Sequence, residues 1–65
     1  MTDFLVRDCG SIVQIQPLTK GAFVWVESQL ETEPWQWLGP TLNIDRRFAG
    51  DIIRGMKAAG LKEDA

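Results

Sequence analysis

The chain has 65 residues, which allows one small domain with a thin core, because a domain of this size buries only about 60% of the surface that its unfolded chain exposes. A composition of 45% hydrophobic and 25% charged residues is typical of a globular protein and excludes a disordered chain. The net charge of -2 and the pI near 4.8 argue against a protein that binds nucleic acid mainly through its overall charge.

The alternation of apolar and polar residues predicts a β-hairpin at the start of the chain. A strand over Phe4–Asp8 is followed by a two-residue turn at Cys9-Gly10 and a second strand. This turn would place Val6 opposite Val13. The same register gathers four apolar side chains on one face: Phe4, Val6, Val13 and Ile15.

A helix is predicted after this hairpin. Pro17 ends the second strand, and Thr19 is a good N-cap for a helix over Lys20–Leu30. Helical spacing predicts an inward arc formed by Ala22, Phe23, Trp25, Val26, Gln29 and Leu30.

A second hairpin is predicted after the polar linker that ends at Pro34. Trp35–Leu38 is the expected strand and Gly39-Pro40 the turn, which places Trp37 opposite Leu42 and Trp35 opposite Ile44. A proline at the second turn position is unusual unless the peptide is cis, so a three- or four-residue loop is an alternative. All three tryptophans are predicted to lie in the core.

The last predicted element is a helix from Arg46 to about Ala59, capped by Asp45. Its predicted apolar arc comprises Phe48, Ala49, Ile52, Gly55, Met56 and Ala59. Gly60 is the expected residue after its C-cap, in a Schellman-type ending. Residues 62–65 are expected to be a frayed tail.

Together these elements predict a ββαββα chain in the α+β class. The turn glycines of the two hairpins, Gly10 and Gly39, are 29 residues apart, so the chain reads as two hairpin-helix units over about residues 3–30 and 35–61 of a single domain, 1–65. We expect one four-stranded antiparallel sheet with both helices on one face. The strand order is not determined by the sequence.

The motif residues resemble a family of small bacterial proteins that are functionally uncharacterised and often belong to prophages or mobile elements. The matching residues are Ser11-Ile12-Val13, Pro17-Leu18-Thr19, Ala22, Trp25-Val26, Trp37 and Gly39. The resemblance covers nearly the whole chain and implies a fold, but no catalytic residues. Pro40 departs from it, since a second glycine is expected there.

Residue types that most catalytic sites need are scarce. The chain has no histidine and a single cysteine, Cys9, which excludes Ser/His and Cys/His nucleophile pairs, an all-thiolate zinc site and an intramolecular disulfide. The glycines of Gly50–Gly55 fall within a predicted helix and lack the Lys-Ser/Thr ending of a phosphate-binding loop. We therefore expect no enzymatic activity, no cofactor, no metal and no small-molecule substrate.

The sequence predicts a cytoplasmic protein. No basic region followed by an apolar run marks a secretory signal, and no stretch approaches 18 apolar residues, so we expect no membrane segment. Cys9 is open to two interpretations: a thiol exposed in a turn and activated by Arg7, or an unreactive residue that is tolerated in the turn or lies partly against the sheet.

The sheet face away from the helices is the first candidate binding surface. We predict that Leu5, Ile12 and Leu38 form an apolar patch there that binds a protein partner or a second copy in a weak homodimer. Scattered surface aliphatics are the alternative, and strand addition at an edge is a third possibility. The predicted partner face comprises Leu5, Ile12, Gln14, Gln16, Gln36 and Leu38.

A basic stripe on the last helix is the second candidate. It could bind phosphates of a nucleic acid, or it could be a solvated face balanced by nearby acids. The stripe comprises Arg46, Arg47, Arg54 and Lys57. The leading hypothesis is thus a non-enzymatic protein-interaction module, and the alternative is a small nucleic-acid-binding or regulatory factor.

Overall fold

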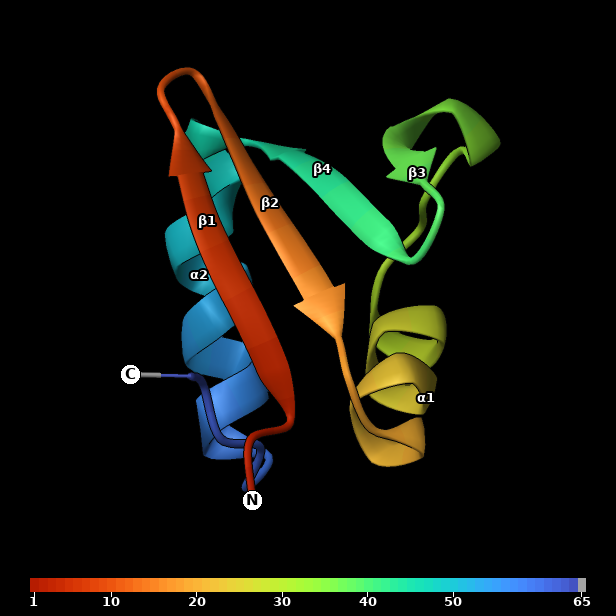
Figure 1. Cartoon of the computed structure of the whole chain (residues 1–65), viewed down its shortest axis with the longest axis vertical. Helices are drawn as coiled ribbons and strands as arrows, with labels where there is room; N and C mark the ends of the chain where they lie inside the picture. The colour runs from red at the N-terminus through yellow and green to blue at the C-terminus, as the bar shows by residue number, and fades with distance from the viewer. Residues whose placement is uncertain (65) are drawn as a thin grey trace.

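The computed structural model describes residues 1–64 and confirms an α+β fold with the predicted order of strands and helices (Figure 1). Its elements are β1 (Phe4–Cys9), β2 (Ile12–Pro17), α1 (Lys20–Gln29), the 3-10 turn η1 (Pro34–Gln36), β3 (Trp37–Leu38), β4 (Thr41–Asp45) and α2 (Arg46–Ala58). The four strands form one antiparallel sheet.

The strand order is β1-β2-β4-β3, so each hairpin contributes its second strand to the centre of the sheet. β2 and β4 pair antiparallel, with Val13 opposite Ile44 and Ile15 opposite Leu42. These four side chains point to the same face and are buried there. The two hairpins therefore meet along their most apolar strands.

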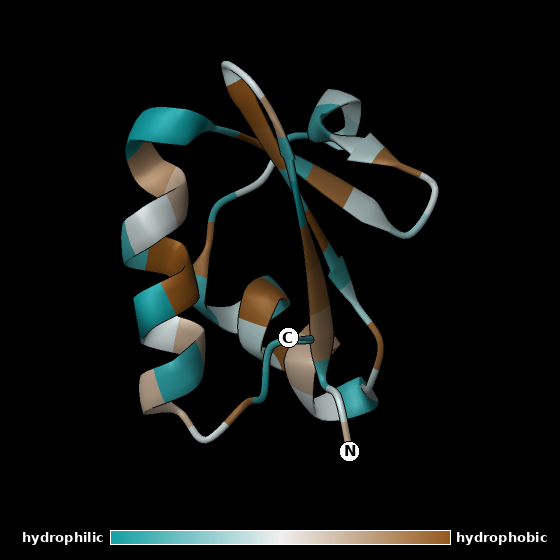
Figure 2. Cartoon of the chain, turned by 60° about the vertical axis from the view of Figure 1, so that its left-hand side comes forward, coloured by the Kyte–Doolittle hydropathy of each residue, from teal (hydrophilic) through white to brown (hydrophobic). Residues whose placement is uncertain are grey.

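Both helices cover this apolar face, as Figure 2 shows. α1 contributes Ala22 and Val26 to the core, and α2 contributes Ala49 and Met56. Burial of these apolar side chains supplies most of the favourable free energy of a small domain. The complete set of buried residues is Phe4, Val13, Ile15, Ala22, Val26, Leu42, Ile44, Ala49 and Met56.

The helix boundaries follow the predicted caps. The Thr19 hydroxyl accepts a hydrogen bond from the Ala22 N–H at 3.2 Å, and Asp45 Oδ1 accepts one from the Arg47 N–H at 2.9 Å. Gly60 has a φ of +89°, and the N–H groups of Gly60 and Leu61 donate to the carbonyl oxygens of Lys57 and Met56, in the pattern of a Schellman motif. Each helix ends one residue earlier than predicted.

The predicted turn of the first hairpin was wrong by one position. Gly10 and Ser11 form the turn, so Val6 lies opposite Ile15 and Cys9 is the last residue of β1. A turn with Gly10 first needs a positive φ only at this glycine, where φ is +86°, whereas a type I′ turn over Cys9-Gly10 would force the cysteine to positive φ. The register shifts by two residues, so the inward face is unchanged.

The second hairpin has the predicted two-residue turn at Gly39-Pro40, with Trp37 opposite Leu42. Gly39 has a φ of +61°, and residues 1–64 contain no cis peptide bond. The strand is shorter than predicted, because η1 replaces its first half. Trp35 consequently lies on the surface, 79% exposed, instead of opposite Ile44 in the core.

The segment after α2 is bound to β1, which corrects the prediction of a frayed tail for residues 62–64. The Phe4 N–H donates to the Lys62 carbonyl at 3.2 Å, and the Asp64 N–H donates to the Phe4 carbonyl at 2.9 Å. Phe4 and Glu63 form a parallel bridge. The last position of the predicted tail, residue 65, lies outside the described residues.

Candidate interaction surfaces

The open face of the sheet carries the side chains that the core does not use, arranged in rows across the strands. In the central row, Arg7 lies opposite Gln14, which lies opposite Asn43. Gln14 Nε2 donates a hydrogen bond to Asn43 Oδ1 at 3.0 Å. The middle of this face is thus polar, and its two central side chains, Gln14 and Asn43, are hydrogen-bonded to each other.

The predicted apolar patch is not continuous. Leu5 lies opposite Gln16 at one edge, Leu38 lies opposite Thr41 at the other, and Ile12 lies opposite Asp45. Polar side chains therefore separate the three aliphatic residues. Leu38 is the most accessible of them, with 70% of its surface exposed.

Part of this face is hollowed. A shallow depression of about 360 Å³ lies over β1 and β2 and reaches β4. Its lining includes three of the predicted partner-face residues, Leu5, Gln14 and Gln16, together with Arg7 and Thr41. The structure therefore brings these three residues to one site and leaves Ile12 and Leu38 outside it.

Gln36 is committed to local structure. Its side-chain oxygen accepts a hydrogen bond from the Glu33 N–H at 2.8 Å, as in a capping box, and its carbonyl accepts one from Asn43 Nδ2 at 3.0 Å. Both contacts hold η1 in place beside β4. Of the six residues predicted for the partner face, Gln36 is therefore the least available to a partner.

Three aromatic residues were predicted to point inward but lie on the surface: Trp35 at 79% exposed, Phe48 at 57% and Phe23 at 46%. The helical spacing of Phe48 gave no signal for its exposure. For Trp35 a signal was present, since the sequence from Glu33 to Gln36 has a proline at the first helical position and a glutamine three residues after the cap. This pattern favours a helical turn over the strand that we predicted.

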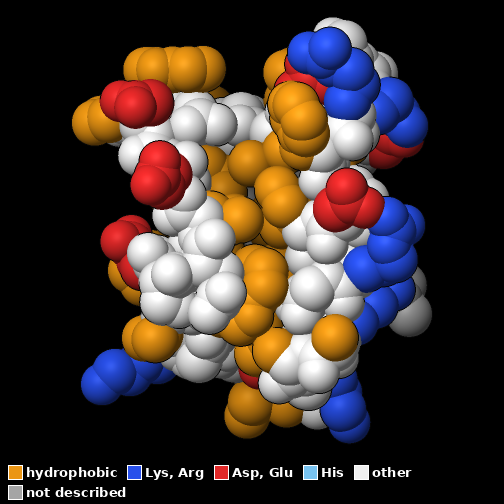
Figure 3. Space-filling view, turned by 180° about the vertical axis from the view of Figure 1, so that it is seen from behind, with side chains coloured by type: hydrophobic (Ala, Val, Ile, Leu, Met, Phe, Trp, Pro, Cys, Tyr) orange, Lys and Arg blue, Asp and Glu red, His pale blue; other side chains and the backbone are white. Residues whose placement is uncertain are grey.

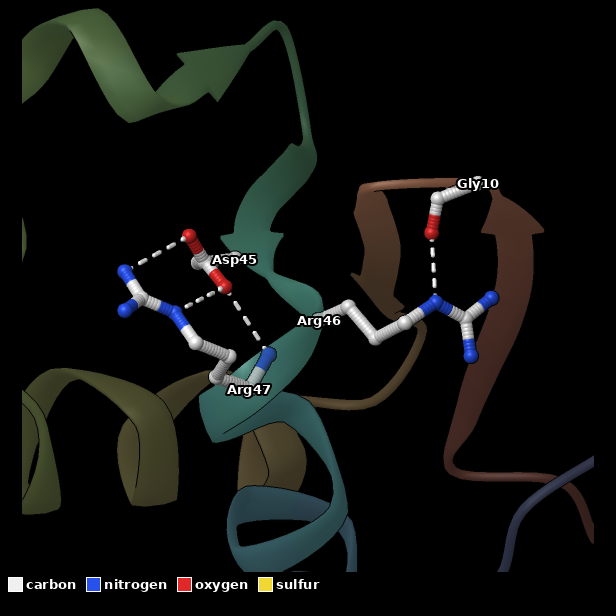
Figure 4. Close-up of polar contacts among 4 residues, drawn as sticks. All are labelled: Gly10, Asp45, Arg46 and Arg47. Carbon is white, nitrogen blue, oxygen red and sulfur yellow. Dashed lines mark hydrogen bonds and ion pairs between the residues drawn. The ribbon is translucent and has the colours of Figure 1, made fainter.

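The first two residues of the basic stripe point away from each other (Figure 4). Arg46 reaches back to the first hairpin turn, where it donates to the Gly10 carbonyl and forms an ion pair with Asp8. Arg47 forms an ion pair with Asp45 at 3.1 Å. Hydrogen bonds from Arg46 and then from the Gly10 N–H lower the pKa of Asp8.

The ion pair between Asp45 and Arg47, at the start of α2, shifts the pKa values of both residues. Hydrogen bonds from the side chain and the backbone N–H of Arg47 lower the pKa of Asp45, and the Asp45 side chain raises the pKa of Arg47. Two arginines in the first turn of a helix oppose its dipole. Here, Asp8 and Asp45 supply the compensating negative charge, so no external anion is needed to explain these arginines.

The other two stripe residues are paired as well. Arg54 forms an ion pair with Asp51 one turn earlier, and Lys57 Nζ lies 3.1 Å from Glu63 Oε1. All four cations are exposed and each has a carboxylate partner. A phosphate would have to compete with these carboxylates, which weakens the case for a nucleic-acid site.

Other chemistry is sparse in the part of the chain that the structure describes. Cys9 is exposed and belongs to β1 rather than to a turn, so the interpretation as a turn residue was wrong. Within residues 1–64, no group of three or more His, Cys, Asp or Glu side chains could hold a metal ion. No helix among these residues is both long enough and apolar enough to span a bilayer.

Comparison with known proteins adds no relative: no family model, no curated protein and no solved structure matches the chain. The resemblance to a family of small bacterial proteins stays a prediction. Any functional assignment must therefore come from the surfaces of this molecule.

Proposed function

We propose that the protein is a non-enzymatic interaction module that binds a protein partner, or weakly a second copy of itself, through the open sheet face or a free strand edge. The observation that supports this proposal is the exposure of Leu38, the last residue of β3. Leu38 and Leu5 flank a polar, hollowed centre, which combines apolar anchors with hydrogen-bonding groups as protein interfaces do.

The area of the open face favours a weak rather than an obligate homodimer. The four strands contain 19 residues in all, and at about 3.3 Å per residue and about 4.8 Å between strands they give a footprint of about 300 Å². A standard interface buries about 800 Å² on each partner. Self-association through this face alone would therefore be weak, whereas a foreign protein could also use a strand edge.

The outer edges of β1 and β3 support partner binding by strand addition. The segment at Lys62–Asp64 covers only the start of β1, and β3 pairs with β4 only as far as Leu42. Unpaired backbone groups on such edges can accept an added strand. The open face and these edges together form the surface that we assign to partner binding.

Sedimentation equilibrium at micromolar to millimolar concentrations tests self-association. If the face mediates it, the dimer is lost in Leu5→Glu or Leu38→Glu and kept in Lys20→Glu, a matched control on α1. If the protein is a strict monomer, affinity capture from the native cell should yield a partner that the Leu38→Glu variant loses and the control keeps. A monomer whose captured proteins are the same for all variants would overturn the proposal.

The alternative of a nucleic-acid-binding or regulatory factor has less support, because the four stripe cations are paired. It predicts that affinity for DNA or RNA falls steeply with salt and drops in a double variant, Arg46→Glu with Arg54→Glu. Unchanged amide chemical shifts on titration with either nucleic acid would exclude it.

A further inference from the structure

An apolar groove lies on the helix side of the molecule, between the α1–η1 segment and α2. It has a volume of about 530 Å³, within the usual range for ligand sites. Figure 3 shows hydrophobic side chains along its floor, between the two helical ridges. The apolar residues that line it include Leu30, Trp35, Ile44, Phe48 and Ile52.

The two aromatic side chains of this groove are its most exposed apolar parts. Trp35 is held there by η1, whose first residue is Pro34 and whose last residue, Gln36, accepts a hydrogen bond from the Glu33 N–H. Phe48 lies on the opposite wall, in the first turn of α2. η1 therefore fixes Trp35 in an exposed position at the groove. A tryptophan in such a position is suited to contact a partner, because aromatic residues are enriched at binding sites.

The free edge of β4 forms one wall of the groove. The Arg46 N–H donates to the Ser11 carbonyl of the neighbouring chain segment at 3.0 Å. Because backbone groups alternate in direction along an antiparallel strand, those of Asn43 and Asp45 point to the outer side. β3 pairs with β4 only at Thr41 and Leu42, and Gln36 of η1 lies beside Asn43, whose Nδ2 donates a hydrogen bond to the Gln36 carbonyl. Asp45 pairs with Ile12 of β2 on its inner side, so the outer edge of β4 at Asp45 can pair with an added extended segment.

The negative charge along the rim of the groove favours a ligand that carries a basic group. Glu31 lines the groove, and Glu27 and Glu33 belong to the same ridge, where Figure 3 shows acidic side chains. The ion pairs found within residues 1–64 involve none of these three carboxylates. On the α2 side, the guanidinium carbon of Arg47 lies 5.4 Å from the centre of the Phe48 ring, and this arginine is paired with Asp45.

We propose that this groove binds a short extended peptide segment, in which one large apolar side chain enters between Trp35 and Phe48 and a neighbouring lysine or arginine meets Glu31. The peptide backbone meets the outer edge of β4 at Asp45. This inference goes beyond the proposed function, because it adds a second binding site, on the helix side of the sheet, and names the class of its ligand.

Selection of random nonapeptides displayed on phage against the intact protein tests the inference. We expect the selected sequences to share one large apolar residue next to a lysine or arginine. A synthetic peptide of the selected sequence should shift the amide resonances of Thr32, Trp35, Ile44 and Phe48 and bind more weakly as salt increases.

Matched variants separate the groove from the rest of the surface. Trp35→Ala and Glu31→Lys should each weaken peptide binding by about tenfold or more, a typical effect of losing an anchor or a charge contact. Val24→Ala, at an exposed apolar residue of α1, and Asp64→Lys should change it less than twofold, because neither residue lines the groove. Circular dichroism verifies that each variant is folded.

Several results would overturn the inference. The selected peptides could lack the apolar-basic pattern, bind as a helix, or bind equally well to Trp35→Ala. A homodimer that Trp35→Ala disrupts would also overturn it, because a second copy of the chain would then occupy the groove. If peptide binding fails while Leu38→Glu still abolishes partner capture, only the groove assignment is lost. If both fail, the proposed function is lost with it.

Discussion

Gln14 and Asn43 occupy equivalent positions in the two hairpin-helix units and form a hydrogen bond with each other. They are 29 residues apart, the same separation as the turn glycines Gly10 and Gly39, and they lie opposite each other where β2 pairs with β4. The approximate twofold symmetry of the chain therefore passes through this pair. Asn43 Nδ2 also donates to the Gln36 carbonyl, so one amide group connects three segments.

Substitution of this pair should measure how strongly the two units are coupled. Asn43→Ala removes two hydrogen bonds and should lower the free energy of unfolding by about 1–3 kcal/mol, whereas Gln14→Ala removes one and should cost about 0.5–1.5 kcal/mol. In urea unfolding, the double variant should cost less than the sum of the two single variants. Gln16→Ala, on the same strand and face, is the control and should change stability by less than about 0.5 kcal/mol. Additive effects would show that the units are not coupled here.

Asp3 should make the protein sensitive to acid. Its carboxylate accepts hydrogen bonds from the Lys62 N–H at 2.8 Å and the Thr19 hydroxyl at 2.9 Å, and these two contacts, in this order, lower its pKa below the ordinary value of 3.8. A pKa lowered by folding adds stability that is complete above the unfolded pKa and is lost as the pH falls through the folded one. The urea midpoint should therefore fall as the pH decreases below about 4.

Asp3→Asn tests this dependence. An amide has one acceptor oxygen, so the variant can keep only one of the two hydrogen bonds and should have a lower urea midpoint at pH 7. Its midpoint should also fall less between pH 5 and pH 2 than that of the wild type, measured by tryptophan fluorescence. Some dependence should remain, because the pKa values of Asp8 and Asp45 are lowered too. Parallel pH curves for the two proteins would contradict a role for Asp3.

Features that depend on local chemistry were predicted from the sequence. Thr19, Asp45 and Gly60 act at the helix ends as expected, because a cap needs only one side chain or one positive φ close to the helix. The inward faces of the strands were also correct. The first turn was wrong by one position, but the resulting two-residue shift in register leaves every side chain on its face.

Features that depend on distant partners were not predicted. A helical projection places Arg46 correctly on the surface, but its partner Asp8 is 38 residues away and no periodicity shows the contact. The pairing of β2 with β4 likewise depends on how two hairpins pack. Trp35 was misplaced for another reason: its hydrophobicity favoured a core position, although the capping pattern around Pro34 determines the backbone there.

Two glycines of α2 should respond in different ways to the same substitution. A Cβ at Gly50 would lie 3.6 Å from Arg54 Nη1, an ordinary van der Waals contact, so Gly50→Ala should stabilise the helix by about 0.5–1 kcal/mol. A Cβ at Gly55 would lie 3.1 Å from the Trp25 ring. Gly55→Ala has the same gain in helix propensity but crowds the contact between the two helices, so it should be less stable than Gly50→Ala by about 1 kcal/mol or more.

Thermal unfolding of both variants checks this difference. The Trp25 ring lies next to Gly55 and not next to the position of a Cβ at Gly50, so its indole resonance should shift in Gly55→Ala and stay in place in Gly50→Ala. Equal stabilisation by both substitutions would mean that the helices are farther apart at this point than the structure shows.

Two neighbouring tryptophans should differ sharply in their contribution to stability. Trp37 is half-buried, its ring centre lies 5.9 Å from that of Phe23, and its Nε1 donates to the Thr32 hydroxyl at 3.0 Å. Trp37→Ala should therefore lower the free energy of unfolding by about 3 kcal/mol, near the lower end for aromatic core residues. Trp35→Ala should change it by less than about 0.5 kcal/mol, because the Trp35 side chain is mostly in solvent. Urea unfolding followed by far-ultraviolet circular dichroism measures both without relying on tryptophan fluorescence. A large loss in Trp35→Ala would instead place this residue in the core, as the alternation of the sequence had indicated, and would remove the aromatic wall on which the groove depends.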